Sequence, residues 1–128
     1  MAEKMRSPLG RAYGLGSARE GAKDWWAMRL SSVALVPLTL WFVISVIRNA
    51  GADYETFAAW VGSPLPAVLL VVTIAVTFHH AAHGLQVVIE DYVHVEWQKL
   101  TLLIAVKFGC VLLAVAGIFA VARIAFGS

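Results

Sequence analysis

Three long stretches of the chain carry almost no charge, and they restrict the folds that the chain can adopt. Residues 30–47 and 64–89 contain no charged side chain, and residues 100–122 contain only Lys107. Each stretch reaches the roughly 18 to 20 apolar residues that a helix needs to cross a bilayer. A soluble domain of 128 residues would have nothing left to cover three such helices. We therefore predict an all-α membrane protein with three transmembrane helices, at about residues 25–48, 64–92 and 96–123.

The segment before the first apolar stretch is polar and predominantly basic. Up to Arg29 it holds six basic residues against three acidic ones: Lys4, Arg6, Arg11, Arg19, Lys23 and Arg29 against Glu3, Glu20 and Asp24. By the positive-inside rule, residues 1–24 form a cytoplasmic N-terminal arm. Three spans then place residues 48–63 and the C-terminus outside and residues 90–99 inside. The net charge of +2 does not indicate a nucleic-acid partner.

Polar residues outside the central stretch have simple structural interpretations. Residues 54–60 are compatible with a short helix on the outer membrane surface. Ser31 and Ser32 suit helix packing or bonding to the backbone. Lys107 suits a side chain that extends to the inner membrane surface, and Cys110 suits a small buried apolar residue.

The most informative stretch is residues 78–92, which ends the second apolar segment. It contains three of the four histidines, namely His79, His80 and His83. On a helix, Asp91 lies within roughly 20° of His80, but roughly 120° from His79 and 80° from His83. The axial rise puts His80 and Asp91 roughly 16 Å apart, about half the hydrocarbon thickness. His80 is therefore predicted near mid-membrane, with a polar pair, Asp91 and Tyr92, at the interface.

A histidine inside a membrane span indicates a functional site, since a polar ring there must be ligated or hydrogen-bonded. One interpretation is axial ligation of haem iron by His80. No histidine occurs in the other two spans, so the second ligand would come from another polypeptide. A second interpretation pairs His79 with His83 on zinc or copper, although no third ligand is evident. The simplest interpretation is hydrogen bonding between helices.

Three further residues have both a plain and a functional interpretation. Asp91 and Tyr92 suit a helix end facing water, but a tyrosine hydroxyl can donate to a quinone carbonyl and a carboxylate can relay protons. Arg29 can extend to lipid phosphate or hold an anionic group between helices.

Together these residues resemble the D-type hydrophobic membrane-anchor subunit of succinate dehydrogenase, the respiratory complex II. The resemblance rests on His80-Ala81-x-x-Gly84 followed by Asp91-Tyr92, on Arg19, Asp24 and Arg29 before and at the start of the first span, and on the three spans. It implies that His80 ligates haem b, that Tyr92 bonds ubiquinone with Asp91 beside it, and that Arg29 meets the haem propionates.

The resemblance also implies the partners of the chain. A C-type cytochrome b anchor subunit would supply the other haem ligand, and an iron–sulfur subunit would complete the ubiquinone pocket. A flavoprotein subunit would oxidise succinate, so this chain is expected to be a subunit of an enzyme without a catalytic residue of its own. The expected location is the bacterial inner membrane, in contact with lipid and within a multi-subunit helix bundle. The alternatives are a haem b anchor of another respiratory oxidoreductase and a non-redox membrane scaffold.

Overall fold

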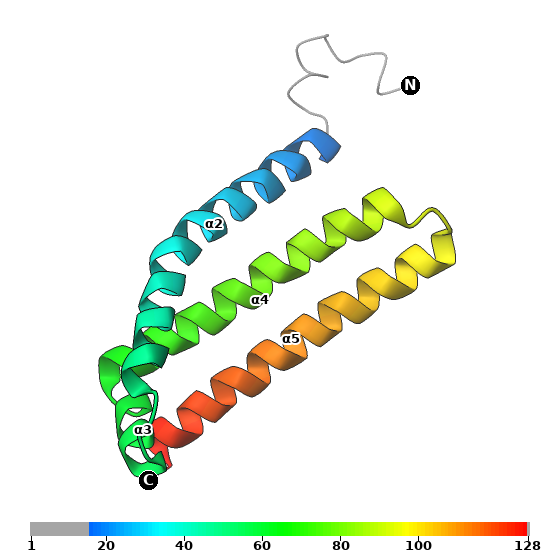
Figure 1. The fold of residues 1–128 in the computed structure, drawn as a ribbon. Helices are drawn as coiled ribbons and strands as arrows, with labels where there is room; N and C mark the ends of the chain where they lie inside the picture. Colours follow the sequence, from blue (N-terminus) through cyan, green and yellow to red (C-terminus); the bar gives the residue numbers. More distant parts are fainter. Residues whose placement is uncertain (1–15, 128) are drawn as a thin grey trace, which may run out of the picture. The chain divides into compact units, whose positions relative to one another are not determined.

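The structure, a computed structural model, describes the backbone of residues 16–127 and the side chains of residues 22–127. Within these residues the regular secondary structure is entirely helical, which confirms the predicted fold class (Figure 1). The helices are α2 (Gly16–Asn49), α3 (Tyr54–Val61), α4 (Pro64–Tyr92) and α5 (Glu96–Phe126).

Three of the helices are long and apolar enough to cross a membrane. The candidate spans are Ala22–Asn49 within α2, the whole of α4 and the whole of α5. The prolines agree with these bounds. Pro64 and Pro66 stand in the first turn of α4, where a proline ring costs no helical hydrogen bond. Pro37 lies inside α2 and does not end it.

The chain divides into two compact units, residues 1–30 and 31–128, and α2 contributes to both. In the first unit, α2 begins at Gly16, inside the segment expected to be the N-terminal arm. Alanine, arginine, glutamate and lysine are common in residues 18–23, and these are strong helix formers. The rest of the expected arm, residues 1–15, lies outside the described residues.

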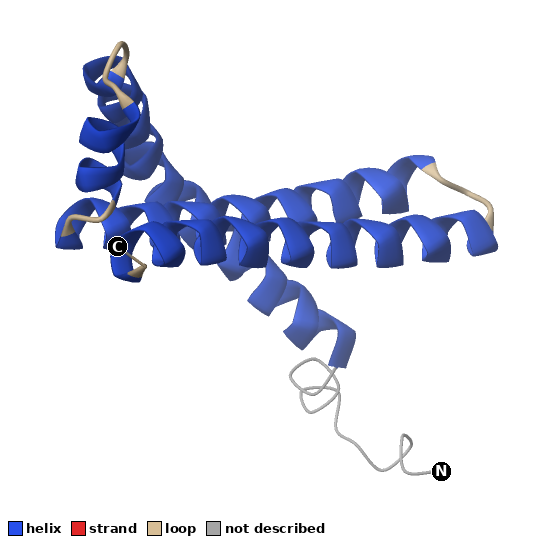
Figure 2. Cartoon of the chain, turned by 90° about the horizontal axis from the view of Figure 1, so that it is seen from below, coloured by secondary structure: helices blue, strands red, loops and turns tan. Residues whose placement is uncertain are grey.

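In the second unit, α4 and α5 form an antiparallel pair joined by residues 93–95. They lie side by side in both views (Figures 1 and 2). Their close approach depends on Gly117, because a Cβ atom built there would lie 3.3 Å from two side-chain carbons of Ile74. A side chain at residue 117 would therefore displace the Ile74 side chain or the helix that carries it.

The buried core of the second unit lies where α3 meets the start of α4 and the end of α5. Val61, Leu70 and Val121 are buried there. The Trp41 ring of α2 stacks on the Trp60 ring of α3, with centroids 6.0 Å apart. The connection before α3 turns at Gly51, whose φ of +84° suits glycine. This arrangement ties α2 to the α4–α5 pair through α3.

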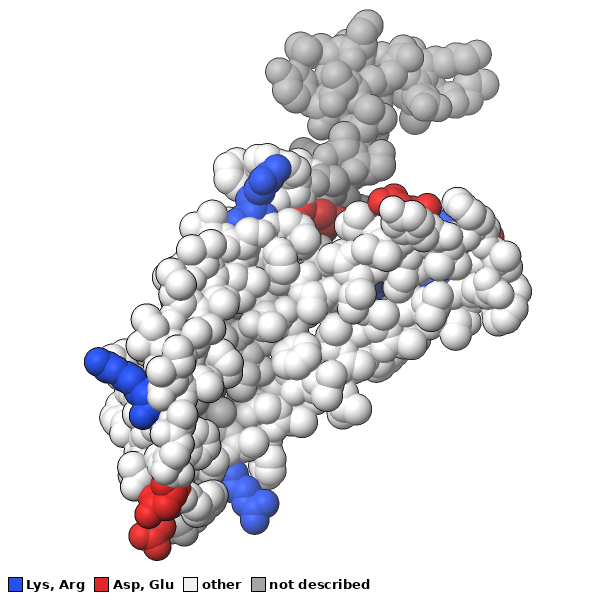
Figure 3. Space-filling model, viewed as in Figure 1, with Lys and Arg blue, Asp and Glu red and all other residues white. Residues whose placement is uncertain are grey.

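Most of the remaining apolar surface is exposed. Large apolar side chains along all three long helices face outward. On the face shown in Figure 3, the charged side chains of the described residues form only a few groups on an otherwise uncharged surface. So large an apolar surface must be covered by lipid or by other membrane helices.

Candidate functional site

His80 of α4 faces Ser31 of α2. The Nδ1 atom of its ring lies 2.9 Å from the Ser31 hydroxyl oxygen, and the bond joins residues far apart in the sequence. Ser31 is only 7% exposed, and it is one of two buried polar side chains within residues 22–127. The contact therefore fixes the orientation of the His80 ring from a second helix.

The hydrogen bond has two possible directions, and each leaves the other ring nitrogen in a different state. If the Ser31 hydroxyl donates to Nδ1, the proton of a neutral ring is on Nε2. If Nδ1–H donates to the Ser31 oxygen, Nε2 carries a lone pair that can bind a metal. Nε2 has no hydrogen-bond partner among the described residues. Every fully buried side-chain nitrogen or oxygen in the described residues does have a partner, so Nε2 is not fully buried.

His80 lines an open groove between α2 and α4. The groove has a volume of ≈ 440 Å³, and its surface is almost entirely apolar. Its other lining residues all come from α2: Ser32, Leu35, Val36, Thr39 and Leu40. Ligand sites in proteins combine such apolar walls with a few polar groups that fix orientation. His80 is the only residue lining this groove whose side chain has a ring nitrogen that could bind a metal.

The other two histidines of the stretch interact with each other. The ring centroids of His79 and His83 lie 4.6 Å apart, and Nδ1 of His83 lies 3.3 Å from the backbone oxygen of His79. In the described part of the chain, no group of three or more His, Cys, Asp or Glu side chains is placed to hold a metal ion. Among the described side chains, the pair thus has no third ligand of this kind for zinc or copper.

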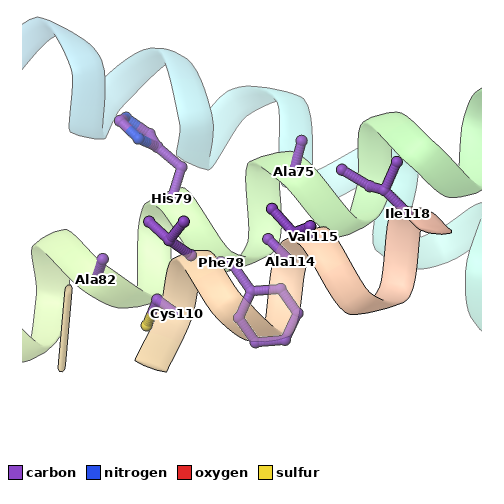
Figure 4. Close-up of a pocket in the computed structure, with 9 residues that line it drawn as sticks. Ala75, Phe78, His79, Ala82, Cys110, Ala114, Val115 and Ile118 are labelled. Atoms are coloured by element: carbon purple, nitrogen blue, oxygen red, sulfur yellow. The ribbon is translucent and has the colours of Figure 1, made fainter. Parts of the chain in front are cut away.

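His79 lines a different hollow from His80. This hollow, of ≈ 250 Å³, lies between α4 and α5, and its lining residues are apolar except for His79 and Cys110 (Figure 4). Cys110, the single cysteine of the chain, is partly buried. His79 and His80 therefore border two different hollows, the first between α4 and α5 and the second between α2 and α4.

Asp91 and Tyr92 end α4, and both are exposed. Tyr92 is 77% exposed, so its hydroxyl is accessible to a partner. Just before this pair on α4, the side-chain amide nitrogen of Gln86 donates a hydrogen bond to the Glu90 carboxylate at 3.1 Å. The twelve residues from His80 to Tyr92 correspond to roughly 18 Å along the helix axis. The structure thus places His80 and the Asp91–Tyr92 pair at different levels of α4.

Arg29 belongs to the first unit. Its side chain is exposed, and its guanidinium carbon lies 5.1 Å from the centroid of the Trp25 ring. Trp25 in turn meets the edge of Trp26, with centroids 5.1 Å apart. A guanidinium above an indole face is stabilised by the negative potential of the ring and keeps its N–H groups available.

Ser31 is the residue at this site that the sequence did not single out. It was expected to pack helices or bond to the backbone, and its bond to the His80 ring is an additional role. A serine beside an apolar run is a weak signal, since serines in membrane helices commonly bond within their own helix. Only the pairing of α2 with α4 identifies it.

Comparison with known proteins gives consistent results. The family described as "Succinate dehydrogenase/Fumarate reductase transmembrane subunit" matches residues 3–116. The succinate dehydrogenase hydrophobic membrane anchor subunit of Paracoccus denitrificans is 37% identical over 95% of this chain and 94% of its own length. The protein of the same description from Rickettsia bellii is 32% identical over 94% of this chain and 97% of its own length. No solved structure is significantly similar to the chain.

Proposed function

Because this chain belongs to the family of succinate dehydrogenase/fumarate reductase transmembrane subunits, we propose that it holds haem b and shapes a ubiquinone site in that complex. As a multi-pass membrane anchor, it attaches the soluble subunits to the bilayer. His80 is one axial ligand of haem b, and Tyr92 and Asp91 belong to the ubiquinone-reduction site. The other axial ligand comes from a C-type anchor subunit.

The observation that carries this proposal is the hydrogen bond between Ser31 and Nδ1 of His80. A histidine that ligates a metal through one ring nitrogen almost always donates its other N–H to a neighbouring acceptor. The Ser31 oxygen, 2.9 Å from Nδ1, is such an acceptor. In this direction of the bond, the lone pair on Nε2 is available at the accessible side of the ring.

The residues around His80 also fit a flat, apolar macrocycle. The groove that His80 lines is open at its surface and walled by α2 side chains. At Gly84, one turn after His80, a Cβ atom would meet nothing within 4 Å, so this face of α4 has room beside the ring. A haem held by His80 supplies a one-electron redox centre within the membrane. Arg29 belongs to the other unit and is proposed on its chemistry alone, because its available N–H groups suit the carboxylates of haem propionates.

At the end of α4, Tyr92 and Asp91 have the chemistry required for a quinone. Reduction of a quinone to a quinol takes two electrons and two protons. The exposed Tyr92 hydroxyl donates a hydrogen bond to a quinone carbonyl and so favours negative charge on that oxygen. The Asp91 carboxylate, exposed beside it, orients the headgroup or passes protons from water. The iron–sulfur subunit supplies the electrons and completes the pocket, and the flavoprotein subunit oxidises succinate.

The basic N-terminal segment places the N-terminus in the cytoplasm. The connection between α4 and α5 then lies on the cytoplasmic side of the bacterial inner membrane, and α3 lies outside. Single cysteines at exposed residues 52 and 94 test this orientation in a Cys110→Ala background. An impermeant maleimide added to intact cells should label Ala52→Cys and leave His94→Cys unlabelled. The opposite labelling pattern would reverse the proposed orientation.

Ligation is tested by replacing His80 with alanine in the complex purified with its partner subunits. The b-type absorption bands should be lost or shifted, while the subunits still copurify. His79→Ala is the matched control, because His79 has the same side chain in the adjacent position and does not line the groove that contains His80. If the absorption bands were unchanged in His80→Ala and lost in His79→Ala, the haem ligand would be His79, and the proposal would be refuted.

A further inference from the structure

A third hollow lies at the opposite end of the second unit from Tyr92. It has a volume of ≈ 590 Å³ and is formed by α3 and the last turns of α5, which are neighbours in Figure 1. Its walls carry polar and apolar surface in comparable amounts, whereas the two hollows described above are almost wholly apolar. Its lining residues are Tyr54, Ala58, Phe119, Ala120, Arg123, Ile124 and Gly127.

Arg123 is the only charged side chain that lines this hollow. It is exposed, and within the described residues its side chain makes no ion pair or hydrogen bond. The two acidic residues at the start of α3 do not line the hollow, and Asp53 already accepts a hydrogen bond from the Thr56 backbone nitrogen at 2.9 Å. The polar side of the hollow therefore presents an unpaired guanidinium together with the exposed Tyr54 hydroxyl.

The two sides of the hollow differ in chemistry along the membrane normal. Arg123 lies in the last turn of α5, where the candidate span ends. Phe119, one turn earlier, is 65% exposed and lies within the apolar part of the span. A molecule with negative charge at one end and an apolar chain at the other is complementary to both sides of this site. Phosphate, the anionic group of a phospholipid, is a group that the arginine fork binds through two parallel hydrogen bonds.

We propose that this hollow binds one phospholipid of the bilayer. Its phosphodiester is held by Arg123 and Tyr54, and one acyl chain lies along Phe119 and Ala120. The bound lipid covers the contact between α3 and α5 and so stabilises the end of the unit that contains the buried core. The site is independent of His80 and of the quinone residues at the other end of α4.

The test uses the whole complex purified in mild detergent, with phospholipid counted by native mass spectrometry. Arg123→Gln should retain one phospholipid fewer than the unmodified complex. Arg48→Gln is the matched control, because Arg48 is an exposed arginine in the last turn of α2 that does not line the hollow. This control should retain the full number. Equal retention in Arg123→Gln and the unmodified complex would overturn the proposal.

A titration separates a phospholipid site from a general apolar contact. Dioleoylphosphatidylglycerol added to the delipidated complex should raise its melting temperature, whereas dioleoylglycerol, which lacks the phosphate, should not. In Arg123→Gln the phosphatidylglycerol concentration for half the effect should rise about tenfold, as expected for one lost charge-assisted pair. An equal response to both lipids would refute the site, and so would no response, as when a partner subunit covers the hollow.

If Arg123→Gln does not assemble, Ala120→Trp provides the same test with the arginine in place. Ala120 is exposed and lines the apolar side of the hollow, so an indole there fills the space assigned to the acyl chain. The variant should again lose one phospholipid and the phosphatidylglycerol response. Normal lipid binding in Ala120→Trp would contradict the assignment of the acyl chain and overturn the proposed site.

Discussion

Replacement of Ser31 by alanine tests the proposed site at the point where the structure is most specific. The change removes the hydroxyl that lies 2.9 Å from Nδ1 of His80 and leaves His80 itself in place. Because Ser31 is nearly buried, little water can replace the lost partner. The ring is then free to rotate, and its Nδ1–H proton has no fixed acceptor. Haem affinity should fall, and the spectrum should broaden or shift.

The size of the effect follows from two independent estimates. A neutral hydrogen bond contributes about 0.5–1.5 kcal/mol net, which changes an equilibrium constant by roughly 2- to 13-fold. Loss of a group that orients a metal-bound histidine commonly lowers metal affinity by about 10- to 100-fold. The two ranges overlap near tenfold, so we expect haem to bind about tenfold more weakly in Ser31→Ala.

The assay is haem retention and redox titration of the purified complex. Ser31→Thr keeps a hydroxyl and should restore most of the affinity. Ser32→Ala is the matched control, since the adjacent serine lines the groove while the bond between Ser31 and His80 remains. If Ser31→Ala retains haem with the same affinity and midpoint potential as Ser32→Ala, the bond does not orient a ligand and the reasoning is refuted.

Three further predictions concern other parts of the chain. Tyr92→Phe should lower quinone reduction by at least tenfold with little change in the haem spectrum; unchanged turnover would remove Tyr92 from the quinone site. Gly117→Val should destabilise the α4–α5 pair by about 1–3 kcal/mol in a thermal melt, because its side chain meets Ile74, whereas Gly109→Ala, with open space around it, should not. The hydrogen bond at the start of α3 lowers the pKa of Asp53 below 3.8. The stabilisation of α3 by this hydrogen bond should therefore persist at neutral pH and disappear as pH falls through that lower pKa. Amide hydrogen exchange in the first turn of α3 measures it. Protection that does not change with pH after correction for the intrinsic exchange rate, or that is the same in Asp53→Ala, would contradict this prediction.

The helices themselves follow from the sequence. Long uncharged stretches leave no other way to satisfy backbone groups in a bilayer, so three spans could be predicted without knowledge of their packing. The bounds of α4 agree with the prediction because prolines begin it and a polar, charged segment ends it. The start of α2 was the poorest boundary, since residues 16–24 are polar and yet helical. Polarity shows where a span ends, but it does not show where a helix ends.

The sequence also selected His80 from three neighbouring histidines, through its alignment with Asp91 on one helical face. That ligand role stays a prediction, as do the roles of Tyr92, Asp91 and Arg29. The structure adds a different kind of evidence, because it joins the His80 ring to Ser31 of α2, whereas His79 does not line the groove that contains His80. Helical periodicity gives angles around one axis, and it carries no information on which neighbour occupies each side.

The sequence by itself therefore determined the number of spans, their chemistry and the short list of residues proposed as cofactor ligands. All of these depend on interactions within one helix or between a helix and its solvent. Only the tertiary structure joined Ser31 to His80 and brought Arg123 beside Tyr54 in one hollow. Those juxtapositions depend on how side chains of different helices fit together, and nearly every alternative packing of three apolar helices would bury a similar apolar area.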